Sequence, residues 1–249
     1  MPARDPSPSS SASPASSATK RRPTGREAGQ SPTVPADTLQ RVIAAASELF
    51  ATRGLGTTLA DVAGHAGVGV ATVYRRFRTK DELIYEVYAD RIRAGEELAR
   101  QAAAELDAWQ GFVRFFEQSI GILAGDRGLR DLTTGGYTRS LGWARGTKPD
   151  RLAQLLGENH KTMGVHLVEL VRRAKQAGEL RRDFEATDMM LLSIAVQATI
   201  TFGGTDHPDL YRRALRYILD GLRPPRPGVT PLPAPALAAA DLPQGRRRR

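Results

Sequence analysis

Residues 57–83 decide the fold, and they read TTLADVAGHAGVGVATVYRRFRTKDEL. Thr58 followed by Asp61 is typical of a helix N-terminus, because the hydroxyl and the carboxylate satisfy backbone N–H groups that the first turn leaves unbonded. The helix that starts here is short, and Gly67 provides a tight turn into a third helix, which we expect from Gly69 to Phe77. A short helix, a glycine turn and a second short helix form the pattern of a helix-turn-helix.

Helical periodicity continues on both sides of this stretch. A first helix is predicted over residues 37–53, ending at Gly54 or Gly56, either of which can adopt the left-handed conformation that closes a helix. A long fourth helix opens at Thr79. Apolar residues at every third or fourth position predict further helices over residues 149–178, 187–203 and 208–222. No convincing strand alternation occurs, so the predicted fold class is all-α.

Proline marks the ends of the folded region. Of the 16 proline residues, seven lie in residues 1–36 and seven in residues 223–249. Segments rich in proline and poor in large apolar residues cannot bury enough surface to offset the entropy of ordering. We therefore expect disordered tails over these two ranges. Between them we expect a helix-turn-helix domain over residues 37–84 and a second, helical domain over residues 85–222.

The formal net charge of +9 is concentrated in these predicted tails. Residues 1–36 hold five Lys and Arg against two acids and residues 223–249 hold six against one, so residues 37–222 keep a net charge of only +1. A basic balance suggests an anionic partner such as nucleic acid. The absence of cysteine excludes a disulfide framework and a thiol nucleophile, and no apolar run approaches membrane-spanning length. We expect a cytoplasmic, nucleoid-associated protein that does not bind membranes.

Residues 57–83 strongly resemble the N-terminal domain of the TetR family of bacterial transcriptional regulators, and the likeness extends over residues 39 to about 90. The resemblance implies a two-fold homodimer, a helical C-terminal domain that binds a small-molecule effector, and repression that the ligand relieves. One position departs from the family pattern, which often has Ser-Lys where this chain has Gly69-Val70. A side-chain helix cap and one cationic contact are therefore missing, although glycine costs a cap only a few tenths of a kcal/mol.

The third helix is expected to enter the DNA major groove N-terminus first. Val70 or Ala71 can pack on a thymine methyl group, and either Arg75 or Arg76 can read guanine. By resemblance, Tyr74 donates its hydroxyl to a phosphate, while Thr58 and Lys80 hold flanking phosphates. For Tyr74 the alternative is a half-buried packing role, and for the basic run it is a solvated surface. The predicted DNA-binding residues are Thr57, Thr58, Gly69, Val70, Ala71, Thr72, Tyr74, Arg75, Arg76 and Lys80.

No motif in the C-terminal half names a ligand. Aromatic residues with a few polar groups would suit a small, mostly apolar molecule, although core packing is the alternative role of each one. His160 and His166 are six residues apart and do not share a helix face at the i, i+4 spacing, so no metal site is expected, and no cofactor either. The candidate pocket residues are Phe112, Phe116, Ile120, Tyr137, Trp143, Met163, His166, Leu167 and Met190.

Three classes of function follow from these observations. The leading hypothesis is a sequence-specific DNA-binding repressor, homodimeric on double-stranded DNA with an inverted-repeat operator and released by a small-molecule effector. The alternative is a low-specificity architectural DNA-binding protein that works through its basic tails. An enzyme is not expected, because the sequence has no GxSxG, HExxH, Walker or dinucleotide-binding motif.

Overall fold

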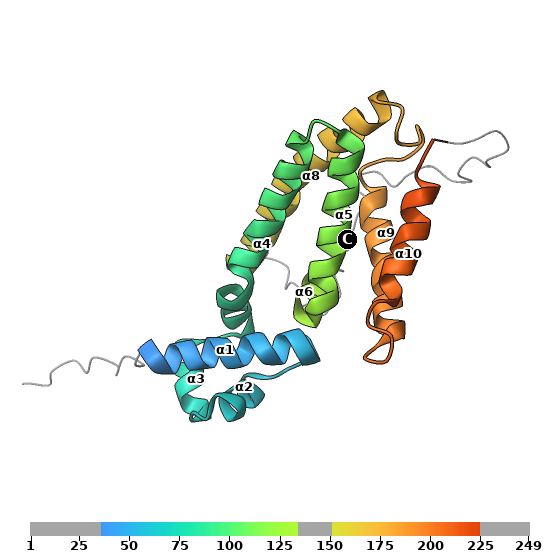
Figure 1. The fold of residues 1–249 in the computed structure, drawn as a ribbon. Helices are drawn as coiled ribbons and strands as arrows, with labels where there is room; N and C mark the ends of the chain where they lie inside the picture. Colours follow the sequence, from blue (N-terminus) through green and yellow to red (C-terminus); the bar gives the residue numbers. More distant parts are fainter. Residues whose placement is uncertain (1–35, 134–150, 225–249) are drawn as a thin grey trace, which may run out of the picture. The chain divides into compact units, whose positions relative to one another are not determined.

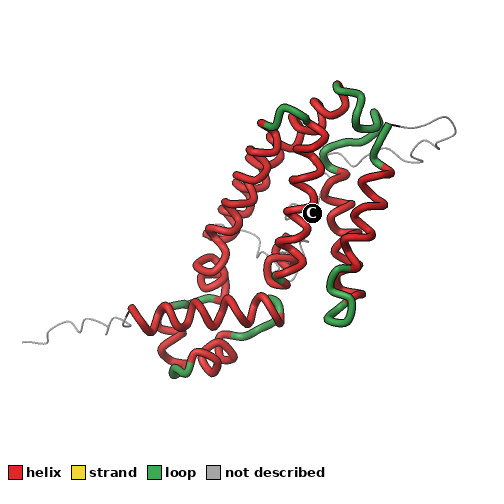
Figure 2. The backbone as a smooth tube through the Cα atoms, viewed as in Figure 1, coloured by secondary structure: helices red, strands yellow, loops and turns green. Residues whose placement is uncertain are grey.

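The computed structural model of the chain describes residues 36–133 and 151–224. Within these two ranges the regular structure consists of nine helices and no strand (Figure 1, Figure 2). The predicted all-α fold class is confirmed. In the same ranges, no helix combines the length and apolar character needed to cross a membrane. The expected disordered tails lie almost entirely outside the described residues.

The first four helices follow the predicted order. They are α1 (Ala36–Arg53), α2 (Leu59–Ala66), α3 (Val70–Arg76) and α4 (Lys80–Ala104). Helix α1 ends where predicted, and Gly54 is the glycine that closes it, with φ of 81°. The apolar stripe of α1 is the buried one, since Val42, Leu49 and Phe50 are at most 3% exposed. Each large side chain buried in this way contributes roughly 1.5–3 kcal/mol.

The remaining described helices are α5 (Ala108–Gly125), α6 (Arg127–Thr133), α8 (Arg151–Gln176), α9 (Asp188–Gly203) and α10 (Leu210–Gly221). Helix α8 lies along α4, α9 pairs with α10, and α5 contacts α4, α8 and α9 (Figure 1). The predicted helix over residues 149–178 is α8, and Gly178 follows its end with φ of 71°. The other two predicted C-terminal helices correspond to α9 and α10.

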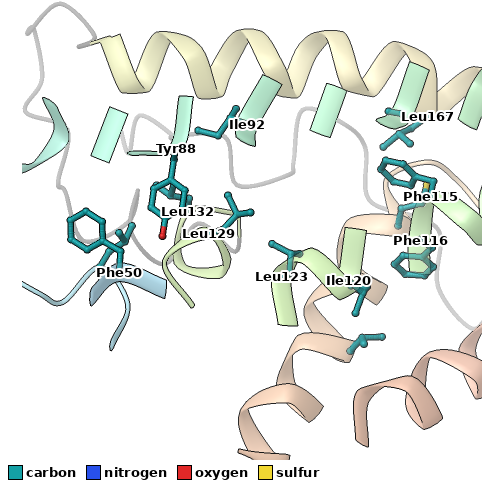
Figure 3. Close-up of a cluster of buried hydrophobic side chains, with 14 of the residues drawn as sticks. Phe50, Tyr88, Ile92, Phe115, Phe116, Ile120, Leu123, Leu129, Leu132 and Leu167 are labelled. Atoms are coloured by element: carbon teal, nitrogen blue, oxygen red, sulfur yellow. The ribbon is translucent and has the colours of Figure 1, made fainter. Parts of the chain in front are cut away.

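A polar cluster centred on the buried Asp126 joins α4 to the junction of α5 and α6. The Tyr88 hydroxyl donates to Oδ1 of Asp126 at 2.8 Å, and the Arg91 guanidinium donates to the other carboxylate oxygen. The same Oδ1 accepts the backbone N–H of Leu129 at 2.9 Å and so caps α6. Burial, together with the hydrogen bond to Asp126, raises the pKa of Tyr88 well above its usual value. In Figure 3, Tyr88 lies beside Leu129 and Leu132 of α6.

The far end of α4 is capped by a side chain from α8. Arg173 donates to the backbone carbonyls of Ala103, Glu105 and Leu106, with distances of 2.5, 2.7 and 3.1 Å. The last carbonyl groups of a helix have no partner within the helix, so a cation placed there satisfies them and also complements the helix dipole. Helix α4 therefore ends at a contact that is about 70 residues distant in the chain.

Candidate nucleic-acid interface

The N-terminus of α2 is closed by the predicted capping pair. The Asp61 N–H donates to Oγ1 of Thr58 at 3.1 Å, and the Asp61 carboxylate accepts the Thr58 N–H at 2.8 Å. The Thr58 hydroxyl also donates to this carboxylate at 2.6 Å, and these bonds lower the pKa of Asp61. A capping box of this kind stabilises a short helix by about 1 kcal/mol. Both residues are exposed, so the start of α2 is accessible to a partner.

The turn between α2 and α3 depends on one left-handed residue. Gly67 has φ of 64° and ψ of 37°, and its N–H donates back to the carbonyl of Gly64 at 3.3 Å. The N–H of Val68 bonds the carbonyl of Ala63 at 3.0 Å. This is the hydrogen-bonding pattern of a helix that ends at a left-handed glycine, and it lets the chain turn sharply into α3 within a few residues. The predicted role of Gly67 is confirmed by its backbone angles.

The inner face of α3 attaches the helix to the core. Val73 is 1% exposed and Phe77, which follows the last helical residue, is 0% exposed. These residues are four apart, so they lie one above the other on the same side of the helix. The N-cap, Gly69, makes no side-chain hydrogen bond, as the sequence predicts for this position. Because Val73 and Phe77 attach α3 to the core, the helix has a single orientation in which its other faces meet a partner.

The outer face of α3 combines apolar, aromatic and cationic side chains. Val70 is 44% and Tyr74 is 52% exposed, and these two residues are one turn apart. Ala71 and Arg75 are also exposed and form a neighbouring pair with the same spacing. At 100° per residue, Ala71 and Arg75 lie on the side of the helix opposite Val73. Large exposed apolar and aromatic side chains beside a cation are what a DNA groove-reading helix presents.

The two arginines of α3 occupy different positions. Arg75 points along the outer face, where its guanidinium donates to Oγ1 of the half-buried Thr72 at 3.2 Å. Arg76 lies nearer the core, with its guanidinium 5.0 Å from the centre of the Phe77 ring. A guanidinium over an aromatic ring is held by a cation–π interaction and by packing of its stem. Both arginines are exposed, and their guanidinium groups contact different neighbours.

Two of the predicted DNA-binding residues lie elsewhere in the structure. Thr57 is only 6% exposed, and its hydroxyl donates to the carbonyl of Gly54 at 3.0 Å. Lys80 is half-buried, and its ammonium group donates to the carbonyl of Leu55. Burial lowers the pKa of Lys80. Both side chains thus hold the turn between α1 and α2 and do not extend from the outer face of α3.

Sequence reasoning missed one residue that acts on the same turn. Asp131, on α6, accepts the backbone N–H of Leu55 at 2.8 Å across 76 residues of sequence. A contact at that separation leaves no local spacing signal, and an acid at this position is ordinary for a helix surface. His65 also has a partner, because its Nε2 lies 2.9 Å from a carboxylate oxygen of Glu48. The His65 side chain itself is exposed.

The candidate pocket residues fall into three groups. Phe112, Phe116 and Ile120 of α5 are at most 2% exposed, and Leu167 of α8 is 9% exposed. Figure 3 shows Phe116, Ile120 and Leu167 within the hydrophobic cluster. The phenylalanine rings pack on other rings: Phe112 lies 5.7 Å from Phe184, centre to centre, in an edge arrangement. The second group, Met163, His166 and Met190, is half-buried. The third group, Tyr137 and Trp143, lies outside the described residues. In the described ranges, no group of three or more acidic or histidine side chains is arranged to hold a metal ion.

A short helix, a left-handed glycine turn and a second short helix with an exposed reading face define a helix-turn-helix DNA-binding protein. Residues 42–87 match the family model described as bacterial regulatory proteins of the TetR family, and residues 107–224 match the C-terminal domain of SbtR-like transcriptional regulators. The chain belongs to the TetR family of transcriptional regulators. The buried aromatic residues of α5 thus lie within the part that matches the second model.

Solved structures of several TetR-family proteins are similar to this chain. CprB from Streptomyces coelicolor, studied in complex with its biological operator sequence, is 20% identical, with 76% of this chain and 89% of CprB covered and a TM-score of 0.52. PfmR from Thermus thermophilus is 19% identical over 72% of this chain and 95% of PfmR, with a TM-score of 0.50. The regulator SCO0520 from Streptomyces coelicolor is 26% identical over 75% and 99% of the two chains, with a TM-score of 0.49. A search of curated protein sequences returned no match.

Proposed function

We propose that the protein is a homodimeric repressor that binds an inverted-repeat operator and leaves it when a small, mostly apolar molecule binds. In this proposal residues 37–84 are the DNA-binding domain and residues 85–222 are the effector-binding and dimerisation domain. The protein acts at the bacterial chromosome in the cytoplasm and has no catalytic role. The observation that supports the proposal most is the outer face of α3, where Val70 and Tyr74 are exposed beside Ala71 and Arg75.

Each side chain of this face has a distinct role in the proposal. Val70 and Ala71 pack on base edges such as thymine methyl groups, and Arg75 reads guanine, because it lies opposite the buried side of α3. Tyr74 and Thr72 donate hydroxyl groups to phosphates, and Gly69 lets the backbone approach the DNA closely. Arg76 contributes positive charge from the side of the helix. Thr58 contacts a phosphate at the exposed N-terminus of α2, where the helix dipole favours an anion.

The dimer is supported by an apolar stripe on the outer face of α9. Leu191 and Ile194 are 41% and 37% exposed, and Phe202 near the end of the helix is 85% exposed. Tyr217 of the paired helix α10 is 63% exposed. Residues at spacings of three, four and seven share one side of a helix, so exposed Ala195 and Ala198 join the same stripe. A two-fold interface needs one self-complementary surface, and in this proposal α9 and α10 provide it.

The proposed effector binds among α5, α8 and α9. Helix α5 contributes the aromatic side chains, and α8 and α9 contribute the half-buried Met163, His166 and Met190. These are apolar groups with one polar ring, which suits a mostly apolar ligand with a few polar atoms. Binding would shift the population of dimers away from the state in which both copies of α3 fit successive major grooves, roughly 34–36 Å apart.

Selection of DNA from a pool of random duplexes by the full-length protein tests the proposal. The expected product is an inverted repeat whose half-sites are about one helical turn apart. If no sequence is enriched, the proposal is wrong. A variant lacking residues 1–36 and 223–249 separates the architectural alternative: a specific regulator keeps its sequence preference without them, whereas a binder that depends on basic tails loses most of its affinity.

A further inference from the structure

The peptide backbone at Leu55 is held from two sides by side chains of other helices. The N–H of Leu55 donates to Oδ2 of Asp131, on α6, at 2.8 Å, and the carbonyl of Leu55 accepts from the ammonium group of Lys80, at the start of α4. Leu55 itself is 3% exposed, so water competes only weakly for its backbone N–H and carbonyl groups. The Leu55 clamp, as we call these two contacts, lies in the turn between α1 and α2.

The residue before Leu55 shows how closely α6 approaches this turn. A Cβ atom at Gly54 would lie 2.5 Å from Oδ2 of Asp131 and 3.1 Å from Nε of Arg127. Gly54 also has φ of 81°, a conformation that L-residues with a side chain seldom adopt. The turn therefore leaves no room for a side chain at position 54 beside the carboxylate. Such a close fit makes the position of the turn depend on the position of α6.

Helix α6 is in turn fixed to α1 and α4. The Asp126 carboxylate caps it and accepts the Tyr88 hydroxyl, as described above. A Cβ atom at Gly128 would lie 3.1 Å from Cβ of Phe50, so the backbone of α6 rests directly on α1. Because α6 is only seven residues long and directly follows α5, a shift of the end of α5 moves Asp131 as well.

We propose that Asp131 is a positioning residue for operator binding, although it lies outside the helix-turn-helix. By holding the N–H of Leu55, it sets the turn that leads through Thr58 into α2 and so fixes the orientation in which α3 meets DNA. The inference rests on the proposed DNA binding and deepens it, because it assigns to that site a positioning residue from outside the helix-turn-helix.

A purely electrostatic role and a positioning role of Asp131 predict opposite changes in DNA affinity when Asp131 is replaced by alanine. Asp131 is an acid on a DNA-binding protein, so removal of its charge should strengthen binding if the charge alone mattered. If Asp131 positions the turn, Asp131→Ala weakens binding because the N–H of Leu55 loses its acceptor. Asp131→Asn removes the same charge but keeps an oxygen that can accept this N–H, so it should preserve binding.

The experiment measures the affinity of the full-length protein for the duplex that selection enriches. Asp131→Ala is expected to bind about tenfold more weakly than the unmodified protein, in line with the loss of roughly one hydrogen bond to a charged acceptor. Asp131→Asn should stay within about threefold of it. The slope of affinity against salt should be unchanged in both, since Asp131 touches no phosphate. Asp90→Ala, which removes an acid from the exposed surface of α4, is the control for charge.

Hydrogen exchange supplies a readout that does not require DNA. The amide of Leu55 should exchange faster in Asp131→Ala than in Asp131→Asn, while the amides in the middle of α8 exchange equally in both. Equal affinity of the alanine and asparagine variants would overturn the proposal, and so would equal exchange at Leu55. If the unmodified protein enriches no duplex, the proposed function fails, but the exchange experiment still tests whether Asp131 holds the turn.

Discussion

The hydroxyl of Tyr88 donates to the carboxylate of Asp126 at 2.8 Å inside the protein, and both residues are at most 6% exposed. Tyr88 lies on α4 and Asp126 precedes α6, so this bond joins the helix that follows the DNA-binding unit to the helix that contacts the turn before α2. A charged acceptor in a buried place strengthens such a bond. It also makes the bond sensitive to removal of either partner.

Tyr88→Phe should lower the free energy of unfolding by roughly 1.5–3 kcal/mol, because Asp126 loses one of the donors that compensate its burial. Urea unfolding followed by circular dichroism measures the change. The matched control is Tyr74→Phe, since Tyr74 is 52% exposed and its substitution should leave stability unchanged. A loss of stability equal in the two variants would contradict the role assigned to the buried bond.

Stability should also depend on alkaline pH through Tyr88. Burial raises the pKa of this phenol in the folded protein above its value of about 10 in the unfolded chain. The contribution is therefore present below about pH 10 and is lost as the pH rises above that value, because only the unfolded chain then releases the proton. Unfolding free energies measured between about pH 9 and 11 should fall more steeply for the unmodified protein than for Tyr88→Phe.

Gly54→Ala should destabilise the protein by more than about 1–2 kcal/mol, the usual cost of a left-handed residue with a side chain. Its Cβ atom would also meet the Asp131 carboxylate. Gly56→Ala in the same turn is the control: it has no positive φ and no atom within 4 Å of the added Cβ, so its effect should stay within about 1 kcal/mol. Thermal unfolding of the two variants checks the difference, and similar melting temperatures would refute it.

Arg75→Ala should relax the base preference at one position of each half-site, with a loss of about 1–3 kcal/mol on the preferred sequence. Arg76→Ala should weaken all duplexes about equally, because Arg76 lies beside Phe77 and contributes charge. Tyr74→Phe should likewise weaken all operators to a similar extent. Binding to a set of single-base operator variants measures these profiles. If Arg76→Ala relaxes the base preference and Arg75→Ala weakens all duplexes equally, then Arg76 reads the base and Arg75 contributes charge.

Phe202→Lys should convert the proposed dimer to a monomer, because it places a charge on the apolar stripe of α9. Sedimentation velocity on the unmodified protein and the variant gives the oligomeric state directly. Val165→Lys is a suitable control, since Val165 of α8 is 66% exposed and lies outside the proposed interface. If the dimer survives Phe202→Lys or dissociates with Val165→Lys, the interface lies elsewhere than on the apolar stripe of α9.

Local signals in the sequence are sufficient to predict the DNA-binding helices. Thr58 and Asp61 form the predicted capping box, Gly67 adopts the predicted left-handed conformation, and both ends of α3 lie within one residue of their predicted positions. These features depend on residues three or four apart, and such spacings are visible in a sequence. The sequence does not show whether Gly54 or Gly56 closes α1. That choice depends on α6, which packs against the turn from a distant part of the chain.

Side-chain roles are harder to predict than helix boundaries. The resemblance assigns Lys80 to a phosphate, yet its ammonium group lies on the carbonyl of Leu55. Thr57 is buried, and no pattern in the sequence points to Asp131. The partner of Lys80 and that of Asp131 lie far away in the sequence, and no local spacing of residues points to either contact. Which residues line an effector site stays a prediction, since Phe112 and Phe116 are packed against other rings.

The backbone contact between Gly128 and Phe50 has a consequence for the construction of hybrid regulators. A chimaera that joined residues 37–84 to the C-terminal helices of another protein would replace the surface on which Phe50 and the Leu55 turn rest. It would also end before Tyr88, which fastens α4 to the cap of α6. Transfer of operator specificity to a new sensor should therefore succeed only when residues 85–92 and 126–131 are grafted together with the DNA-binding helices.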